Sequence, residues 1–203
     1  MKQTFPSMVK YIPEAAQGIA SIEHVEVSEH ASAMSALKGG TSYIPPGRYA
    51  RLKLRGDTVM SDTRIEKITN CEVVNRAHGN VLLAGLGIGM ILVPILKKRE
   101  VKSVLVVEKY QDVIDIVAPH FPSRKLRIVC ADIFDWTPEP SAKFDVIYFD
   151  IWPDQDTGNL PEMGRLHQRF KGCLNRNNPD RWMDSWARDL LRARLREERR
   201  MWP

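Results

Sequence analysis

The pattern of apolar and polar residues divides the chain into three segments. Residues 1–60 contain two stretches, 22–28 and 49–60, in which apolar and polar positions alternate. Alternation with a period of two is typical of half-buried antiparallel strands, and the turn-forming sequence IPPGR lies between the stretches. This pattern predicts an N-terminal β-hairpin region.

From residue 81 to residue 150, apolar runs alternate with a helical pattern. The runs end near Gly85, Glu108, Asp132 and Asp150, and 110–121 has its apolar residues at helical spacing. Alternating strands and helices predict a parallel sheet with right-handed crossovers. Ligands of such sheets bind at the carboxyl ends of the strands, which is where the glycines and acids of this segment fall.

The first apolar run ends in the sequence VLLAGLGIG, residues 81–89. Glycines at this position let the backbone turn sharply and approach a ligand that a Cβ would exclude. Dinucleotide-binding folds use G-x-G-x-x-G, but Met90 occupies the third glycine position of that pattern and the run reads G-x-G-x-G. Dinucleotide binding is therefore only a remote alternative.

The G-x-G-x-G run, with acids ending three successive apolar runs, resembles motif I and the following strands of the class I S-adenosylmethionine (SAM) methyltransferases and their relatives, the spermidine synthases. The resemblance covers roughly residues 50–155. It implies an α/β fold with a Rossmann-like parallel sheet and SAM, or alternatively decarboxylated SAM, as cofactor. The implied cofactor-binding residues are Gly85, Gly87 and Gly89 at the methionine part, Glu108 at the ribose, and Asp132 and Ile133 at the adenine, together with the neighbouring Leu86 and Lys109.

The same resemblance implies where the acceptor is bound. Asp150 would hold or deprotonate the acceptor as the catalytic residue, and Trp152 and Asp154 in the following loop are candidate acceptor-binding residues. For Asp154 and Asp156, capping of the next helix is an equally good interpretation. Asp150 ends a buried strand and needs a partner there, which favours a functional role.

Two features depart from the methyltransferase pattern. Leu83 replaces the usual acid two residues before the first glycine, as the spermidine-synthase branch tolerates. Pro94 lies within the helix expected after the glycines and should kink it.

Upstream of the glycines, residues 61–74 predict a helix that Ser61 caps, with its isoleucines toward the core. Residues 61–63 either cap this helix or line the pocket.

The segment after Asp150 shows no strand pattern, so the sheet is expected to be truncated after its fourth strand. Asn178 and Pro179 predict the start of a helix that carries Trp182 and Trp186 on one stripe. Residues 164–203 hold eleven Arg or Lys and five Asp or Glu, so the basic excess of the chain lies in this tail. An acidic partner fits the tail, whereas nucleic acid is only weakly supported without a recognised motif.

Composition sets the remaining expectations. A chain of 203 residues with 43% apolar content suits one domain, divided into a hairpin region (1–60), a SAM-binding core (61–155) and a basic helical tail (156–203). No apolar run approaches ~20 residues and the N-terminal MKQTFPSMVK lacks an apolar signal core, which predicts a cytoplasmic protein. Three scattered cysteines predict reduced thiols, and the five histidines show no metal-ligand spacing.

The sequence thus predicts a SAM-dependent methyltransferase that acts on a small-molecule acceptor. One alternative is a spermidine-synthase-like aminopropyltransferase, in which the hairpin would help to form a homodimer. A second is a non-catalytic module that retains the nucleoside site and uses its basic tail to bind a partner.

Overall fold

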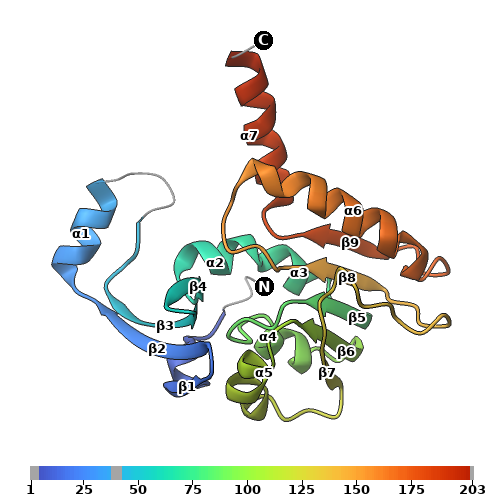
Figure 1. Ribbon diagram of the computed structural model, residues 1–203, viewed down its shortest axis with the longest axis horizontal. Helices are drawn as coiled ribbons and strands as arrows, with labels where there is room; N and C mark the ends of the chain where they lie inside the picture. Colours follow the sequence, from blue (N-terminus) through green and yellow to red (C-terminus); the bar gives the residue numbers. More distant parts are fainter. Residues whose placement is uncertain (1–4, 38–42, 202–203) are drawn as a thin grey trace.

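Two β-sheets and seven α-helices make up the part of the chain that the computed structural model describes, residues 5–37 and 43–201 (Figure 1). The elements are β1 (Ala15–Gln17), β2 (Ala20–Val27), α1 (Glu29–Leu37), β3 (Gly47–Leu54), β4 (Asp57–Ser61), α2 (Arg64–Thr69), α3 (Cys71–Arg76), β5 (Gly79–Ala84), α4 (Leu92–Lys97), β6 (Val101–Glu108), α5 (Gln111–Val117), β7 (Leu126–Cys130), β8 (Val146–Phe149), α6 (Leu160–Phe170), β9 (Trp182–Ser185) and α7 (Arg188–Met201). Residues 1–4 of the N-terminal segment assessed for a signal lie outside this description.

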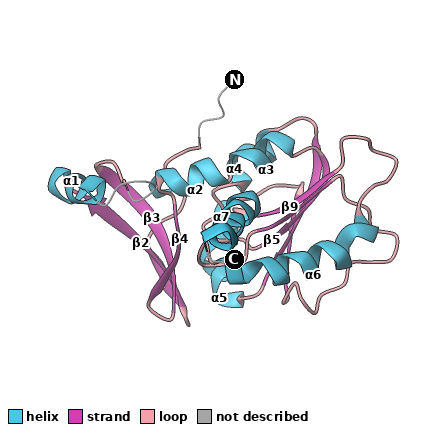
Figure 2. Ribbon diagram, turned by 90° about the horizontal axis from the view of Figure 1, so that it is seen from above, coloured by secondary structure: helices cyan, strands magenta, loops and turns pink. Residues whose placement is uncertain are grey.

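The N-terminal sheet is antiparallel and has four strands in the order β1-β2-β3-β4, which extends the expected hairpin. The alternating stretch 49–60 forms two strands because the chain turns at Arg55 and Gly56, both with positive φ. This sheet stands beside the parallel sheet (Figure 2). It is fastened to α5, where the backbone N–H of Ile19 donates to the carboxylate of Asp112 at 3.0 Å.

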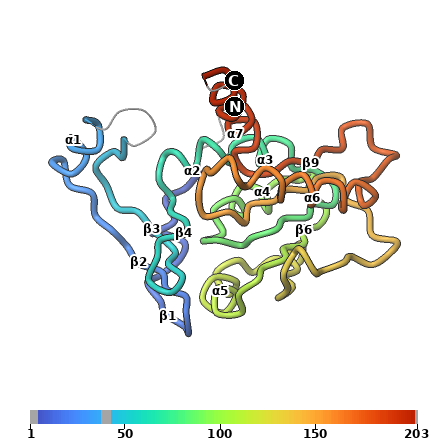
Figure 3. Tube along the Cα trace, turned by 45° about the horizontal axis from the view of Figure 1, so that its top comes forward, coloured from blue at the N-terminus to red at the C-terminus, as the bar shows by residue number. Residues whose placement is uncertain are grey.

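The second sheet is parallel, with strand order β7-β6-β5-β8-β9, and confirms the expected Rossmann-like α/β fold. The expected truncation after four strands is wrong by one strand. Residues 182–185 form β9, which pairs in register with β8 from Trp182–Val146 to Ser185–Phe149. The tail therefore returns along the sheet beside α6 before α7 begins (Figure 3).

The stripe predicted for a helix starting at Asn178 is accordingly split between a strand and the turn after it. Asn178 does not cap a helix: its side-chain amide donates to Asp145 at 2.7 Å and contacts His78 at 2.8 Å. Trp182 and Trp186 are spaced as on one face of a helix, but Trp182 lies on β9 and Trp186 follows directly after it. Helix α7 starts only at Arg188.

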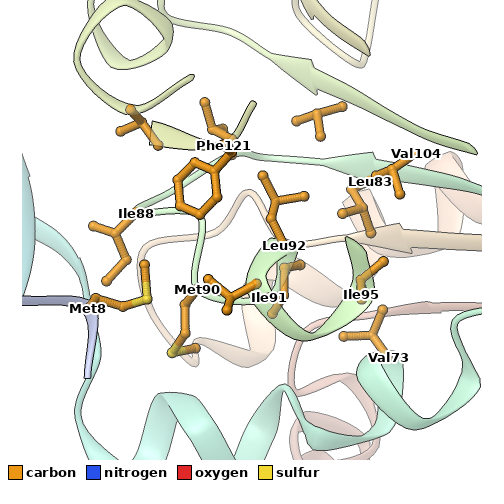
Figure 4. Packing of buried hydrophobic residues seen from close by; sticks show 14 of the residues in the cluster. Met8, Val73, Leu83, Ile88, Met90, Ile91, Leu92, Ile95, Val104 and Phe121 are labelled. Carbon is orange, nitrogen blue, oxygen red and sulfur yellow. The ribbon is translucent and has the colours of Figure 1, made fainter. Parts of the chain in front are cut away.

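Apolar side chains cover the parallel sheet on both faces. On one face, Val81 and Leu83 of β5 pack with α3, α4, α5 and the N-terminal sheet, and on the other Leu82 and Ala84 pack with α6. Figure 4 shows Ile88 of the glycine segment and Leu92 of α4 next to the ring of Phe121. These contacts hold the loop after β5 in place.

Two local predictions upstream and downstream of β5 need correction. Helix α4 begins only at Leu92, so Pro94 falls in its first turn, where no backbone hydrogen bond is lost and no interior kink arises. The predicted helix 61–74 is divided into α2 and α3 at Asn70, and Ser61 ends β4 without capping a helix. Ile68 of α2 is 52% exposed, so it does not face the core.

Among the described residues, no helix has the length and apolar content that crossing a bilayer requires.

Candidate active site

A cavity of about 520 Å³ opens at the carboxyl ends of the parallel strands. It has the size of a small-molecule site and lies where ligands of open α/β sheets bind. Ten of the eleven residues predicted for the site line it: Gly85, Leu86, Gly87, Glu108, Lys109, Asp132, Ile133, Asp150, Trp152 and Asp154.

The glycine loop forms one wall of the cavity and approaches other segments closely. Gly85 has φ of +95°, and a Cβ there would collide with the carbonyl oxygen of Asp150. Gly87 has φ of +51°, and its Cβ position is filled by the Met60 sulfur from β4. Gly89 is the predicted site residue that lies outside the cavity lining: a Cβ at this position would meet the ring of Phe121, so this glycine accommodates core packing.

Glu108 joins the glycine loop to the end of β6. Its side chain is buried, and its two carboxylate oxygens accept hydrogen bonds from the backbone N–H groups of Leu86 at 2.8 Å and Tyr110 at 3.0 Å. Burial raises the pKa of the Glu108 carboxyl, and these N–H donors oppose the rise. An ionised carboxylate has about four lone-pair sites, so Glu108 retains acceptors for ligand hydroxyl groups.

The ends of β6 and β7 are joined by an ion pair. Lys109 Nζ lies 2.9 Å from Asp132 Oδ2, and the hydrogen bond from Lys109 holds the pKa of Asp132 below its usual value. Asp132 also accepts the backbone N–H of Phe134 at 2.9 Å, which shapes the turn that carries Ile133.

Arg169 of α6, which the sequence did not indicate as a site residue, holds the turn that contains Ile133 through hydrogen bonds. Its guanidinium donates to the carbonyl oxygens of Ile133 and Phe134, and to that of Trp136 at 2.8 Å. The planar fork of an arginine suits such multiple acceptors. Arg169 therefore positions the cavity wall that contains Ile133 without lining the cavity itself.

Two further carboxyl groups with raised pKa values line the cavity beside the glycine loop. Burial raises the pKa of Asp150, at the end of β8, to about 7, and the side chain of Asn70 opposes the shift. Burial also raises the pKa of Glu66, on α2, to about 8, and the negative charge of Asp150 adds to the rise. Sequence analysis missed Glu66, because a single acid in a short polar helix has no local pattern that separates it from a solvated one.

Segments other than the glycine loop and the ends of the parallel strands complete the walls. Leu52, Leu54, Val59 and Met60 of the antiparallel sheet line the cavity, so this sheet contributes to the site of its own chain. Trp186, after β9, lines it as well and donates its indole N–H to Thr69 Oγ1 at 2.9 Å. The tail that was expected to be entirely helical thus supplies one aromatic wall.

The loop after Asp150 forms the rim. Trp152 is buried and donates its indole N–H to Glu162 of α6 at 3.1 Å. Asp154 is exposed, lines the cavity and accepts the Asn159 amide at 3.1 Å. Asp156 accepts the backbone N–H of Gly158 at 2.7 Å, which is a capping role. Both interpretations of Asp154, loop organisation and acceptor binding, are compatible with this position.

A metal centre has no support in the described ranges, 5–37 and 43–201, where no group of three or more His, Cys, Asp or Glu side chains could hold an ion.

Comparison with known proteins identifies the fold. No family model matches the chain. Over 126 residues it is 29% identical to Polyamine aminopropyltransferase 1 of Streptomyces coelicolor, a match that covers 56% of this chain and 24% of that protein. The spermidine synthase from Thermotoga maritima superposes with a TM-score of 0.51 at 17% identity, covering 81% of this chain and 52% of the other. A spermidine synthase in complex with the transition-state analogue AdoDATO gives a TM-score of 0.50 with the same identity and coverage.

These similarities show the fold. The chain has the Rossmann-like fold of the spermidine synthases, preceded by an antiparallel sheet, and the fold expected from the glycine motif is confirmed. The chain spans about a quarter of the curated relative and about half of the solved ones.

Proposed function

We propose that this chain binds an adenosyl sulfonium donor and transfers an alkyl group from it to a cationic amine. The observation that carries the proposal is that the glycine loop, the strand-end acids and the two carboxyls Glu66 and Asp150, whose pKa values are about 8 and about 7, line one shared cavity. The similarity to spermidine synthases supports a transferase in general terms.

The cavity residues fit a nucleoside donor. Gly85, Leu86 and Gly87 would face its sulfur-bearing chain, because all three line the cavity. Glu108, with acceptor sites left free, would bind the ribose hydroxyls. The turn containing Lys109, Asp132 and Ile133 would flank the base. The donor would supply a carbon on a sulfonium sulfur, which leaves as a neutral thioether when its bond to that carbon breaks.

The two carboxyl groups suit an amine acceptor. An alkylamine is an ammonium ion near pH 7 and must lose a proton before its nitrogen can attack. Asp150, with a pKa of about 7, is matched to accept that proton near neutral pH. Glu66 would bind a second ammonium group, whose positive charge favours the ionised carboxylate and offsets the effect of burial.

The charge of the cavity wall favours aminopropyl transfer over methyl transfer, which the sequence had placed first. Six acidic residues line the cavity, and among its described lining residues Lys109 is the one with a positive side chain. That lysine is already paired with Asp132. The carboxylate of SAM would therefore meet no free cation, whereas decarboxylated SAM carries only positive charge.

Methyl transfer is the second candidate. Gly87 of the glycine loop lines the cavity, and backbone N–H groups of such loops can bind a carboxylate where no cationic side chain is present. A donor with a carboxylate is therefore compatible with the loop even though the side chains disfavour it.

The first experiment is calorimetric titration with decarboxylated SAM, SAM and methylthioadenosine in parallel, with NAD as the negative control. We expect the tightest binding for decarboxylated SAM. Preference for SAM would support methyl transfer, and binding of none of the three would contradict the cofactor assignment.

The second experiment measures transfer to a panel of mono- and diamines with the parent chain, with Asp150→Ala and with the control Asp135→Ala. Asp135 is exposed. We expect turnover that only Asp150→Ala abolishes. Donor binding with no transfer to any amine in the panel would favour the non-catalytic module.

A further inference from the structure

Helix α7 carries a row of arginines along one face. Arg188, Arg192, Arg196 and Arg199 follow one another at intervals of three or four residues, and such intervals place side chains on the same side of a helix. The last three of these arginines, and the adjacent Arg200, are exposed. Figure 1 shows the C-terminal part of α7 projecting from the rest of the molecule.

Carboxylates neutralise this arginine row only at its base. Arg188 pairs with Asp184 at 3.4 Å, and Arg192 lies 4.0 Å from Asp189. For Arg196, Arg199 and Arg200, no carboxylate oxygen of the described residues lies within 4.0 Å. The projecting part of the row is therefore a strip of uncompensated positive charge, separate from the acid-lined cavity.

The base of the row borders a second hollow. A cavity of about 560 Å³ lies between α7 and the start of α6, and its lining includes Arg188, Arg192, Thr157 and Gly158. Two arginines thus line a space large enough for an anionic group, and the row continues from it along α7.

We propose that the arginine row binds the phosphate backbone of a double-stranded nucleic acid without reading its sequence. Four residues of helix advance about 6 Å, and a duplex carries one negative charge per about 1.7 Å of its axis, so a helix laid against the duplex brings several phosphates near the row. The described part of α7 contains no aromatic residue, so it lacks the stacking groups of single-strand binders. This inference is independent of the proposed transferase activity.

The other faces of α7 argue against a lipid surface as the partner. A helix that lies in a membrane interface buries a continuous apolar face. On α7, Glu197 and Glu198 interrupt the side away from the row, and Leu191 is already buried against the core. A rigid polyanion therefore fits this helix better than an acyl layer.

The test is fluorescence anisotropy of a labelled 20-base-pair duplex titrated with the full chain between 50 and 200 mM salt. Binding through four exposed arginines, Arg192, Arg196, Arg199 and Arg200, predicts a salt slope of about −4 and a loss of affinity of about a hundredfold over that range. The triple variant Arg192→Gln, Arg196→Gln, Arg199→Gln is expected to reduce the slope to about −1. The corresponding triple arginine-to-lysine variant retains the charge and should retain the slope.

The matched control removes three positive charges from a different surface: Lys102→Gln, Arg124→Gln, Arg127→Gln, all of which are exposed near β6 and β7. We expect it to change the affinity by less than about threefold, since contacts with phosphates, and not net charge alone, set the slope. Equal losses in both glutamine variants, no binding of the duplex at 50 mM salt, or stronger binding to vesicles of anionic lipid than to the duplex would each overturn the proposal. Circular dichroism of each variant verifies that it is folded.

Discussion

Glu66 and Asp150 line one cavity from two different layers of the molecule. Glu66 lies on α2, which follows the antiparallel sheet, and Asp150 lies at the end of β8 in the parallel sheet. Burial, and then the charge of Asp150, raises the pKa of Glu66 to about 8, and burial raises the pKa of Asp150 to about 7. The pair is costly to ionise when the cavity holds only solvent, and a bound cation lowers that cost.

The pH dependence of stability should report this cost. The pKa of Glu66 is about 8 in the folded chain against an ordinary value of 4.5, so the folded state holds the proton more tightly. The contribution to the free energy of unfolding is complete below pH 4.5 and is lost as the pH rises through about 8. We expect Glu66→Gln to reduce the fall in stability between pH 5 and pH 9 by about 4 kcal/mol.

Urea denaturation at several pH values measures this effect. Glu72→Gln is the matched control, because Glu72 is an exposed acid on α3 that pairs with Arg76 at 2.8 Å. Its stability profile should parallel that of the parent chain. If Glu66→Gln also gave a parallel profile, the raised pKa of Glu66 would be contradicted.

Glu66 should also set a preference for diamines over monoamines. Its carboxylate would bind the ammonium group that does not react, and loss of one partner of a desolvated ion pair weakens binding strongly. We expect Glu66→Gln to raise the KM for 1,4-diaminobutane at least about tenfold, to leave the KM for butylamine nearly unchanged and to leave the donor Kd unchanged. Steady-state kinetics with both amines measures this difference between the two KM values. A uniform loss with both amines would assign Glu66 a structural role instead.

The strand ends could be predicted from the sequence because local patterns encode them. The apolar runs that become β5, β6 and β8 each end in a glycine or an acid, and a parallel sheet brings such ends to one edge. Gly85, Glu108 and Asp150 therefore meet at the cavity as expected. Gly89 has the same motif spacing, but packing against Phe121 determines its position, which the spacing alone does not reveal.

The remaining parts depend on contacts between segments distant in the sequence. Strand β9 was missed because WMDS contains no apolar run: it is an edge strand whose Asp184 pairs with Arg188. The helical spacing of Trp182 and Trp186 does not reflect a helix. Arg169 and Trp186 contribute to the site through contacts with Phe134 and Thr69, and neither contact has a sequence signal.

Substitution of Gly85 tests the close approach of β5 and β8. Gly85→Ala places a Cβ on the carbonyl oxygen of Asp150 at a φ of +95°, so both strain and collision oppose it. We expect a loss of about 2–4 kcal/mol in the free energy of unfolding, together with loss of donor binding. Gly164→Ala is the control, since a Cβ at this helical glycine meets nothing within 4 Å. That variant should gain about 0.5–1 kcal/mol, and equal destabilisation of both would contradict the steric argument.

Substitution of Arg169 tests how the turn that contains Asp132 and Ile133, which is proposed to flank the base of the donor, is held in place. Its guanidinium donates to the carbonyl oxygens of Ile133, Phe134 and Trp136, so Arg169→Ala leaves these acceptors without their partner and releases the turn. Because Arg169 does not line the cavity, its removal makes the donor site less ordered but takes away no direct contact with the donor. We expect the donor Kd to rise about tenfold, with the KM for the amine unchanged. Arg165→Ala, on the same helix and paired with Glu162 at 3.4 Å, is the control and should bind the donor as the parent does. An unchanged Kd for Arg169→Ala, measured by calorimetry on protein shown to be folded, would mean that the turn is held by Asp132 alone.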